Sequence, residues 1–90
     1  DEIYMNKAEI DLKLNNIDLA IEMYQSVIKE WDYDILADDA IYNLARLYDN
    51  ILKDEVKALS LYEKLLIEHN SSIFVADSRR RYREIREKEL

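Results

Sequence analysis

The stretch from Asp38 to Asn70 contains two amphipathic runs joined by a short polar link at Lys53 and Asp54. In both runs the apolar residues recur at spacings of three and four, which is the period of one face of an α-helix. Small residues stand within both stripes, where two helices must approach closely. The apolar positions are Ile41, Leu44, Ala45, Leu47 and Tyr48, followed by Val56, Ala58, Leu59, Leu61, Tyr62, Leu65 and Leu66. The stretch therefore predicts a helical hairpin.

The composition favours a fold made of helices alone. The 90 residues include no Gly and no Pro, so the chain lacks the strongest helix breakers and the usual turn residues. A hydrophobic content of 49% with 37% charged residues is typical of a packed, soluble helical domain and not of a disordered chain. The length corresponds to one domain. We therefore predict a single all-α domain.

Five helices are predicted, with breaks that polar residues explain. Asn15 and Asn16 end the first helix, because Asn tolerates the left-handed backbone conformation that terminates helices. Asp34 is the predicted cap of the third helix. Asp38 and Asp39 are placed in its first turn, where negative charge interacts favourably with the helix dipole. The connector before it carries Trp31 and Tyr33, which are expected to cover the end of a hairpin; stacking on a ligand is the alternative role. The helices are predicted at 2–13, 18–30, 35 to about 51, about 54 to 68, and 73–88.

The fifth predicted helix differs from the others. Ser72 is its predicted cap, and after its first turn it keeps few apolar residues, chiefly Tyr82 and Ile85. Arginines dominate positions 79–83, and i, i+4 ion pairs are predicted between Asp77 and Arg81 and between Glu84 and Lys88. A terminal helix with one face in water explains this pattern best. The alternative is a basic patch at 79–83 for an acidic protein or RNA.

The helical pair is repeated along the chain. The pattern Ala20-x3-Tyr24-x2-Val27 recurs as Ala58-x3-Tyr62-x2-Leu65, and Tyr4-x3-Ala8 recurs as Ile41-x3-Ala45. Internal repetition of a helix–turn–helix unit is the sequence signature of a solenoid, because neighbouring units must stack to bury a continuous core. We predict repeats at 1–34 and 35–70 and a capping helix at 71–90.

These motifs resemble the tetratricopeptide repeat family. The second unit follows the family pattern at Ile41, Leu44, Ala45, Tyr48, Ala58 and Tyr62, with Asn70 where the family has Pro. The first unit fits at Tyr4, Ala8, Ala20, Tyr24 and Val27, whereas Lys7, Asp11 and Asp32 depart from the pattern. The amino-acid sequence of the second unit is similar to that of the repeats in bacterial cell-envelope scaffold proteins.

The resemblance implies a right-handed superhelical α-solenoid of antiparallel helix pairs with no active site. It also implies a concave groove, lined by the first helix of each pair, that takes a partner's peptide or helix. In this chain the groove residues would be Met5, Glu9, Leu12, Tyr42, Arg46, Asp49, Arg80 and Glu84. These residues carry both signs of charge and several apolar side chains, so a mixed polar and apolar peptide is the expected partner.

One specialised form of the family grips a partner's C-terminal carboxylate with Lys and Asn on its inner helices. Asn43 supplies one such Asn. Met5 and Glu9, however, occupy the places where the first repeat should offer Lys and Asn. The sequence therefore argues against a carboxylate clamp.

Other function classes find little support. The net charge of −7 disfavours a duplex nucleic acid, and the absence of Cys removes thiolate metal sites and Cys nucleophiles. His69 is the only histidine and is expected at a helix C-terminus. Asp38 and Asp39 are adjacent on a helix, so their carboxylates diverge and do not form a catalytic pair. We expect no enzyme activity, no cofactor and no metal.

The expected function is thus a non-enzymatic protein–protein interaction module. The alternative is a structural segment that stacks on a neighbouring repeat or on a second copy, giving a homo-oligomer. No run of apolar residues is long enough to cross a membrane. Because the chain starts at Asp1 and not at Met, it is expected to be part of a longer protein. A bacterial envelope or periplasmic location is expected if a targeting signal lies outside this sequence.

Overall fold

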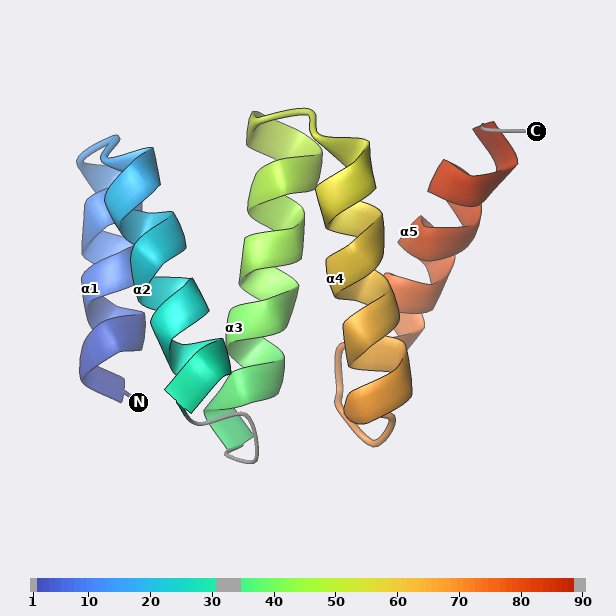
Figure 1. Cartoon of the computed structure of the whole chain (residues 1–90), viewed down its shortest axis with the longest axis horizontal. Helices are drawn as coiled ribbons and strands as arrows, with labels where there is room; N and C mark the ends of the chain where they lie inside the picture. Colours follow the sequence, from blue (N-terminus) through green and yellow to red (C-terminus); the bar gives the residue numbers. More distant parts are fainter. Residues whose placement is uncertain (1, 31–34, 89–90) are drawn as a thin grey trace. The chain divides into compact units, whose positions relative to one another are not determined.

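A computed structural model describes residues 2–30 and 35–88 (Figure 1). Within these ranges the chain forms five α-helices and no strand, which confirms the predicted all-α class. A π-helical segment, η1 (Leu47–Ile51), continues the third helix. The predictions for Trp31, Tyr33 and the Asp34 cap fall outside the described residues. The helices are α1 (Glu2–Lys13), α2 (Ile17–Glu30), α3 (Ile35–Arg46), α4 (Glu55–Glu68) and α5 (Val75–Lys88).

The chain divides into two compact units, residues 1–40 and residues 41–90. The first contains α1, α2 and the start of α3. The second contains the end of α3 together with η1, α4 and α5. The proposed repeat boundaries after residues 34 and 70 stay a prediction.

In the first unit α1 packs against α2 through a tight turn. Asn15 has a φ of 63°, and the Asn16 N–H donates to the Asp11 carbonyl oxygen at 2.6 Å. The predicted break at these two asparagines is therefore confirmed, and the left-handed residue lets the chain reverse direction without a glycine.

The core of the first unit is built from small and aromatic side chains, with an acid inside it. Asp11 is 3% exposed, and its carboxylate lies 3.3 Å from Lys7 Nζ one helical turn away. This ion pair explains why the two positions depart from the apolar stripe. Ile3 and Ile10 lie within the predicted first helix but outside its core, since they are 72% and 55% exposed. The buried apolar residues are Met5, Ala8, Ala20, Tyr24, Val27, Ala37 and Ala40.

In the second unit α4 packs against both η1 and α5. The link before α4 turns at Lys53, with a φ of 57°, and Asp54 caps α4 by accepting a hydrogen bond from the Lys57 N–H at 3.2 Å. His69 is the C-terminal cap of α4, as predicted. Val56 is 75% exposed, so its assignment to the apolar stripe is wrong.

Equivalent positions of the two predicted repeats are buried alike, which is what a repeated helical pair requires. Each small or aromatic residue of the first motif has a counterpart of nearly equal burial in the second. The pairs are Ala8 with Ala45, Ala20 with Ala58, Tyr24 with Tyr62, and Val27 with Leu65, all at most 2% exposed.

Two predicted helix starts need correction. Asp38 lies in the first turn of α3, but Asp39 comes after it. Ser72 does not cap α5, because its Oγ accepts a hydrogen bond from the Phe74 N–H within a turn, and α5 begins only at Val75. Phe74 contributes the first carbonyl oxygen of α5, which accepts from the Ser78 N–H at 3.0 Å. Ile73, predicted in the helix, is 87% exposed in that turn.

Candidate functional site

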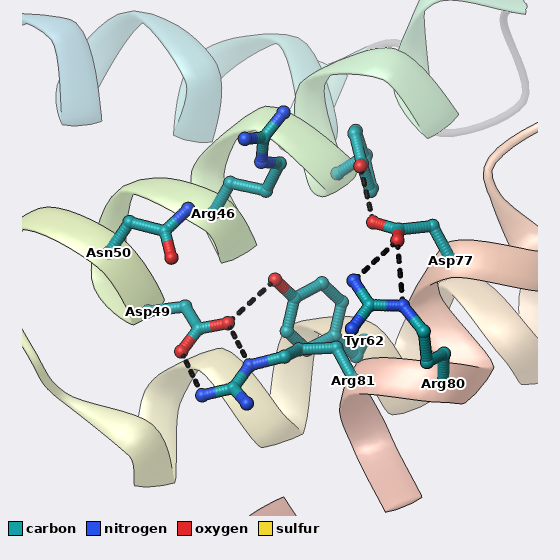
Figure 2. Close-up of a pocket in the computed structure, with 8 residues that line it drawn as sticks. Arg46, Asp49, Asn50, Tyr62, Asp77, Arg80 and Arg81 are labelled. Carbon is teal, nitrogen blue, oxygen red and sulfur yellow. Dashed lines mark hydrogen bonds and ion pairs between the residues drawn. The ribbon is translucent and has the colours of Figure 1, made fainter. Parts of the chain in front are cut away.

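The second unit contains a polar pocket of about 290 Å³ between helices that are distant in sequence (Figure 2). α3 and η1 form one wall, α5 forms the other, and a tyrosine of α4 completes the lining. Three arginines and two aspartates make the pocket strongly polar. The lining residues are Tyr42, Arg46, Asp49, Asn50, Tyr62, Asp77, Arg80 and Arg81.

Asp49 is the centre of a buried network at one end of the pocket. Its Oδ2 accepts hydrogen bonds from Arg81 Nε at 2.6 Å and from the Tyr62 hydroxyl at 3.1 Å, and its Oδ1 accepts from Arg81 Nη2 at 2.8 Å. The fork of the guanidinium thus meets both carboxylate oxygens, which is the strongest geometry for this pair. Figure 2 shows the three side chains converging from η1, α4 and α5.

Asp49 lies in the π-helical segment, within a run of consecutive buried residues. Leu47, Tyr48 and Asp49 are consecutive and all buried, at 3%, 8% and 5% exposure. In a regular α-helix three successive side chains spread over more than half of the circumference. The wider turn of η1, closed by a hydrogen bond from the Leu52 N–H to the Leu47 carbonyl oxygen, brings them closer together on one side.

The network changes the acidity of its members. Hydrogen bonds from Arg81 hold the pKa of Asp49 below its usual value, against the opposing effect of burial. Burial, together with the neighbouring Asp49 carboxylate, raises the pKa of Tyr62 well above that of a free tyrosine. Asp49 is therefore ionised and Tyr62 protonated at neutral pH, so the tyrosine donates and the aspartate accepts.

A second network closes the opposite side of the pocket. The Tyr42 hydroxyl donates to Asp77 Oδ2 at 2.5 Å, while Arg80 donates to Asp77 Oδ1 at 2.7 Å and to Glu84 Oε1 at 2.6 Å. The hydrogen bond from Tyr42 is the main reason why the pKa of Asp77 is lowered. The Tyr42 ring also stacks on Phe74, with ring centroids 4.3 Å apart. Tyr42 is thereby fixed at the edge of the pocket.

Arg46 and Asn50 are two of the exposed polar residues of the pocket. Both are exposed, and they are four positions apart at the end of α3 and in η1. The Arg46 guanidinium lies 5.7 Å from the centroid of the Tyr42 ring, within range of a cation–π contact. Among the described residues, no carboxylate lies within ion-pair distance of Arg46. Its guanidinium acts electrostatically on Asp77 and Tyr42 and remains exposed to solvent.

The predicted groove residues fall into both units. Four of them, Tyr42, Arg46, Asp49 and Arg80, line the pocket, and Glu84 lies beside it through its ion pair with Arg80. The other three belong to the first unit, where Met5 is buried, Leu12 is half-buried and Glu9 is exposed. Their place in a shared groove stays a prediction. Asn43 is not among the pocket residues.

The predicted ion pairs of α5 have different partners. Asp77 pairs with Arg80 at i, i+3 and not with Arg81, which reaches Asp49 instead. Lys88 pairs with Glu55 of α4 at 3.1 Å and not with Glu84. The interpretation of the arginine run as a solvated face is accordingly wrong for Arg81, which is 21% exposed and fixes α5 to η1.

Sequence reasoning missed four lining residues of the pocket: Asn50, Tyr62, Asp77 and Arg81. A signal existed for one of them, since Asn50 follows Arg46 at the i+4 spacing that places two side chains on one helical face. Tyr62 was correctly expected in the core, but its hydroxyl, which faces the pocket, has no separate signature in the sequence.

The described residues hold no cluster of three or more His, Cys, Asp or Glu side chains arranged to bind a metal ion. None of their helices is both long enough and apolar enough to cross a membrane. The chemistry that the pocket offers is recognition through exposed guanidinium and amide groups on a fixed polar frame.

Comparison with known proteins identifies one family. A family model described as tetratricopeptide repeat matches residues 2–32 and 39–72. Searches of curated proteins and of solved structures gave no significant match.

Proposed function

This chain belongs to the tetratricopeptide repeat family, and we propose that it binds a peptide or helix of a partner protein at the polar pocket of its second unit. Repeats of this family are generally protein–protein interaction modules and typically act as non-enzymatic scaffolds. The family therefore gives the class of function. The pocket is our proposal for where the partner binds.

The observation that carries the proposal is the contrast between the frame of the pocket and its exposed groups. Asp49 is hydrogen-bonded to Arg81 and Asp77 to Tyr42, whereas Arg46 and Asn50 face solvent. A frame that is already hydrogen-bonded loses little entropy on binding, so more of the interaction energy appears as affinity. Arginine and tyrosine are also the residue types enriched at binding hot spots.

The proposed ligand is an extended or helical segment with both polar and apolar residues. Arg46 and Asn50 can pair with backbone carbonyl or side-chain oxygens of such a segment. The stacked rings of Tyr42 and Phe74 offer an apolar surface at the edge of the same pocket.

The test is selection of binding peptides from a displayed library, followed by affinity measurement on pocket variants. Arg46→Glu should weaken the selected peptides by about tenfold or more, because an exposed hot-spot cation is replaced by an anion. Asn50→Ala should weaken them less. Lys57→Glu makes the same charge reversal at an exposed position of α4 outside the pocket and should leave affinity close to wild type.

All variants should keep the wild-type circular dichroism spectrum, because the mutated side chains are exposed. Selected peptides that bind Arg46→Glu and Asn50→Ala as tightly as the wild type would exclude the pocket as the binding site.

A second candidate function is structural, and exposed apolar residues of the first unit favour it. Ile3, Ile10 and Leu14 are 72%, 55% and 66% exposed and fall on one side of α1 and its following turn. Such a stripe is expected to be covered by a neighbouring repeat or a second copy. Light scattering tests this function, since a protein that stays monomeric and stable at high concentration would contradict self-association.

A further inference from the structure

The charge of this protein is divided unevenly along the chain. Residues 1–40 contain 11 acidic and 3 basic residues, for a net charge of −8, whereas residues 41–90 contain 9 acidic and 10 basic residues, for a net charge of +1. The total of −7 conceals this asymmetry. One chain therefore presents both a strongly acidic part and a part that carries all of its arginines.

The arginines of α5 have two different roles. Arg80 and Arg81 are paired with carboxylates around the pocket. Arg79, Arg83 and Arg86, which we name the arginine ridge, are exposed and recur at spacings of four and three on another side of the same helix. Among the described residues, no carboxylate lies within ion-pair distance of Arg79 or Arg83. Only Arg86 has a local contact, with the Tyr82 hydroxyl at 3.1 Å.

The first unit offers a complementary surface on α1. Glu2 and Glu9 are exposed and seven residues apart, so they lie on one side of the helix. Ile3 and Ile10, also exposed, follow each of them by one position. Together with Leu14 these residues make an apolar stripe with a row of carboxylates along one edge, which we name the α1 face.

We propose that the arginine ridge of one copy of this protein docks on the α1 face of a second copy. The two surfaces are opposite in charge and match in spacing. Glu2 and Glu9 are separated by seven residues, as are Arg79 and Arg86, and seven residues span about 10.5 Å along a helix. The aliphatic stems of the arginines cover Ile10 and Leu14, while their guanidinium groups pair with the glutamates.

A second copy is the favoured occupant because both halves of the interface are present on the same chain. The contact is head to tail, so each copy uses its ridge on one neighbour and its α1 face on another. The inference rests on the second candidate function, for which it names the contact surfaces, and it is independent of the pocket.

The experiment uses two neutralised variants in sedimentation velocity, over a concentration series that extends to where the wild type associates. Arg79→Gln with Arg83→Gln weakens the ridge, and Glu2→Gln with Glu9→Gln weakens the α1 face. Each variant alone should show a dissociation constant raised by about tenfold. Their equimolar mixture should form a 1:1 dimer and nothing larger, because it contains one intact ridge and one intact α1 face.

Lys53→Gln with Lys57→Gln removes two positive charges elsewhere in the second unit and should leave association unchanged. Added salt should weaken the wild-type association, because exposed ion pairs are screened. Circular dichroism verifies that each variant is folded.

Two outcomes would overturn the inference. One is a wild type that stays monomeric throughout the series, which removes the second candidate function as well. The other is a pair of results: Arg79→Gln with Arg83→Gln leaves association unchanged, whereas a separate variant, Ile10→Ser with Leu14→Ser, abolishes it. That result would keep the second candidate function and refute the ridge as the occupant of the α1 face.

Discussion

Asp49 shows how much one buried carboxylate can contribute to the second unit. Its side chain is 3% exposed and accepts three hydrogen bonds, two from Arg81 and one from Tyr62. Together these bonds connect η1 to α4 and α5. A buried ion pair is not strongly stabilising in itself, but removing one partner is costly because the other charge is left uncompensated.

We therefore predict that Asp49→Ala lowers the free energy of unfolding by about 3 kcal/mol and that Asp49→Asn lowers it by about 1–3 kcal/mol. Urea denaturation followed by circular dichroism measures both. Glu22→Gln, which removes the same charge at an exposed position of α2, should change stability by less than about 0.5 kcal/mol. A loss for Asp49→Asn as small as that of the control would show that the network contributes nothing.

The same residue makes stability depend on pH in a definite direction. The pKa of Asp49 is lower in the folded protein than its ordinary value of 3.8. Its contribution is therefore complete above pH 3.8 and is lost as the pH falls through the lowered pKa. Between these two values the wild type should lose stability faster than Asp49→Asn, and parallel urea titrations would detect the difference.

At the scale of single residues the sequence predicted burial better than it predicted pairing. Tyr24, Tyr62 and Ala58 were placed in the core by their spacing, and they are buried. Arg81 was assigned to Asp77 by helix geometry, whereas its partner is Asp49, more than thirty positions away. The residue pattern along one helix indicates possible ion-pair partners within that helix. It does not indicate a carboxylate on a neighbouring helix.

At the scale of secondary-structure elements, the turns show how a chain without glycine reverses direction. Asn15 and Lys53 both adopt positive φ, at 63° and 57°. Asn tolerates this conformation because its short polar side chain can bond locally, whereas Lys has no such compensation. The Asn15 turn was therefore visible in the sequence, and the left-handed conformation at Lys53 was not.

We predict that Lys53→Gly stabilises the protein by about 0.5–1 kcal/mol. The substitution removes the cost of roughly 1–2 kcal/mol that a non-glycine residue bears in the left-handed region, partly offset by the greater entropy of Gly in the unfolded chain. Thermal unfolding measures the change. Lys53→Ala, which keeps a β-carbon, is the matched control and should give little gain, and a lower melting temperature for Lys53→Gly would contradict the account.

Element boundaries at the two ends of the pocket were harder to predict than the helices themselves. The predicted third helix does extend to residue 51, but its last five residues are π-helical. The fifth helix starts at Val75 because Ser72 bonds within a turn. Both details depend on which of several competing local hydrogen bonds and side-chain contacts form. The same residues are also compatible with a regular α-helix.

At the scale of the whole molecule, charge is expected to affect the two units differently. Residues 1–40 carry −8 and residues 41–90 carry +1, so like-charge repulsion opposes compact structure mainly in the first unit. Salt screens such repulsion over distances of about 10 Å at 0.1 M.

We predict that added salt slows amide hydrogen exchange in α1 and α2 relative to α4. Mass spectrometry of the exchanged protein, at a concentration low enough to keep it monomeric, measures this ratio. A ratio that does not change, or exchange in α1 and α2 that becomes faster relative to α4, would show that repulsion does not limit the stability of the first unit.

The sequence by itself determined the class of fold, the repeated unit and its core. Apolar residues at helical spacing, in a chain without Gly or Pro, leave few structures other than packed helical pairs. The motif also identified the family to which the chain belongs. These properties follow from local periodicity, which is present in every unit.

Only the tertiary structure decided which polar groups are paired within the protein and which remain exposed. It joined the buried Asp49 to Arg81 in a network and left Arg46 and Asn50 exposed at the same pocket. It also separated the paired arginines of α5 from the exposed ridge. The reason is physical: the partner of a charged side chain is fixed by helices that meet in space, and helical period specifies the face of a residue but not what lies opposite it.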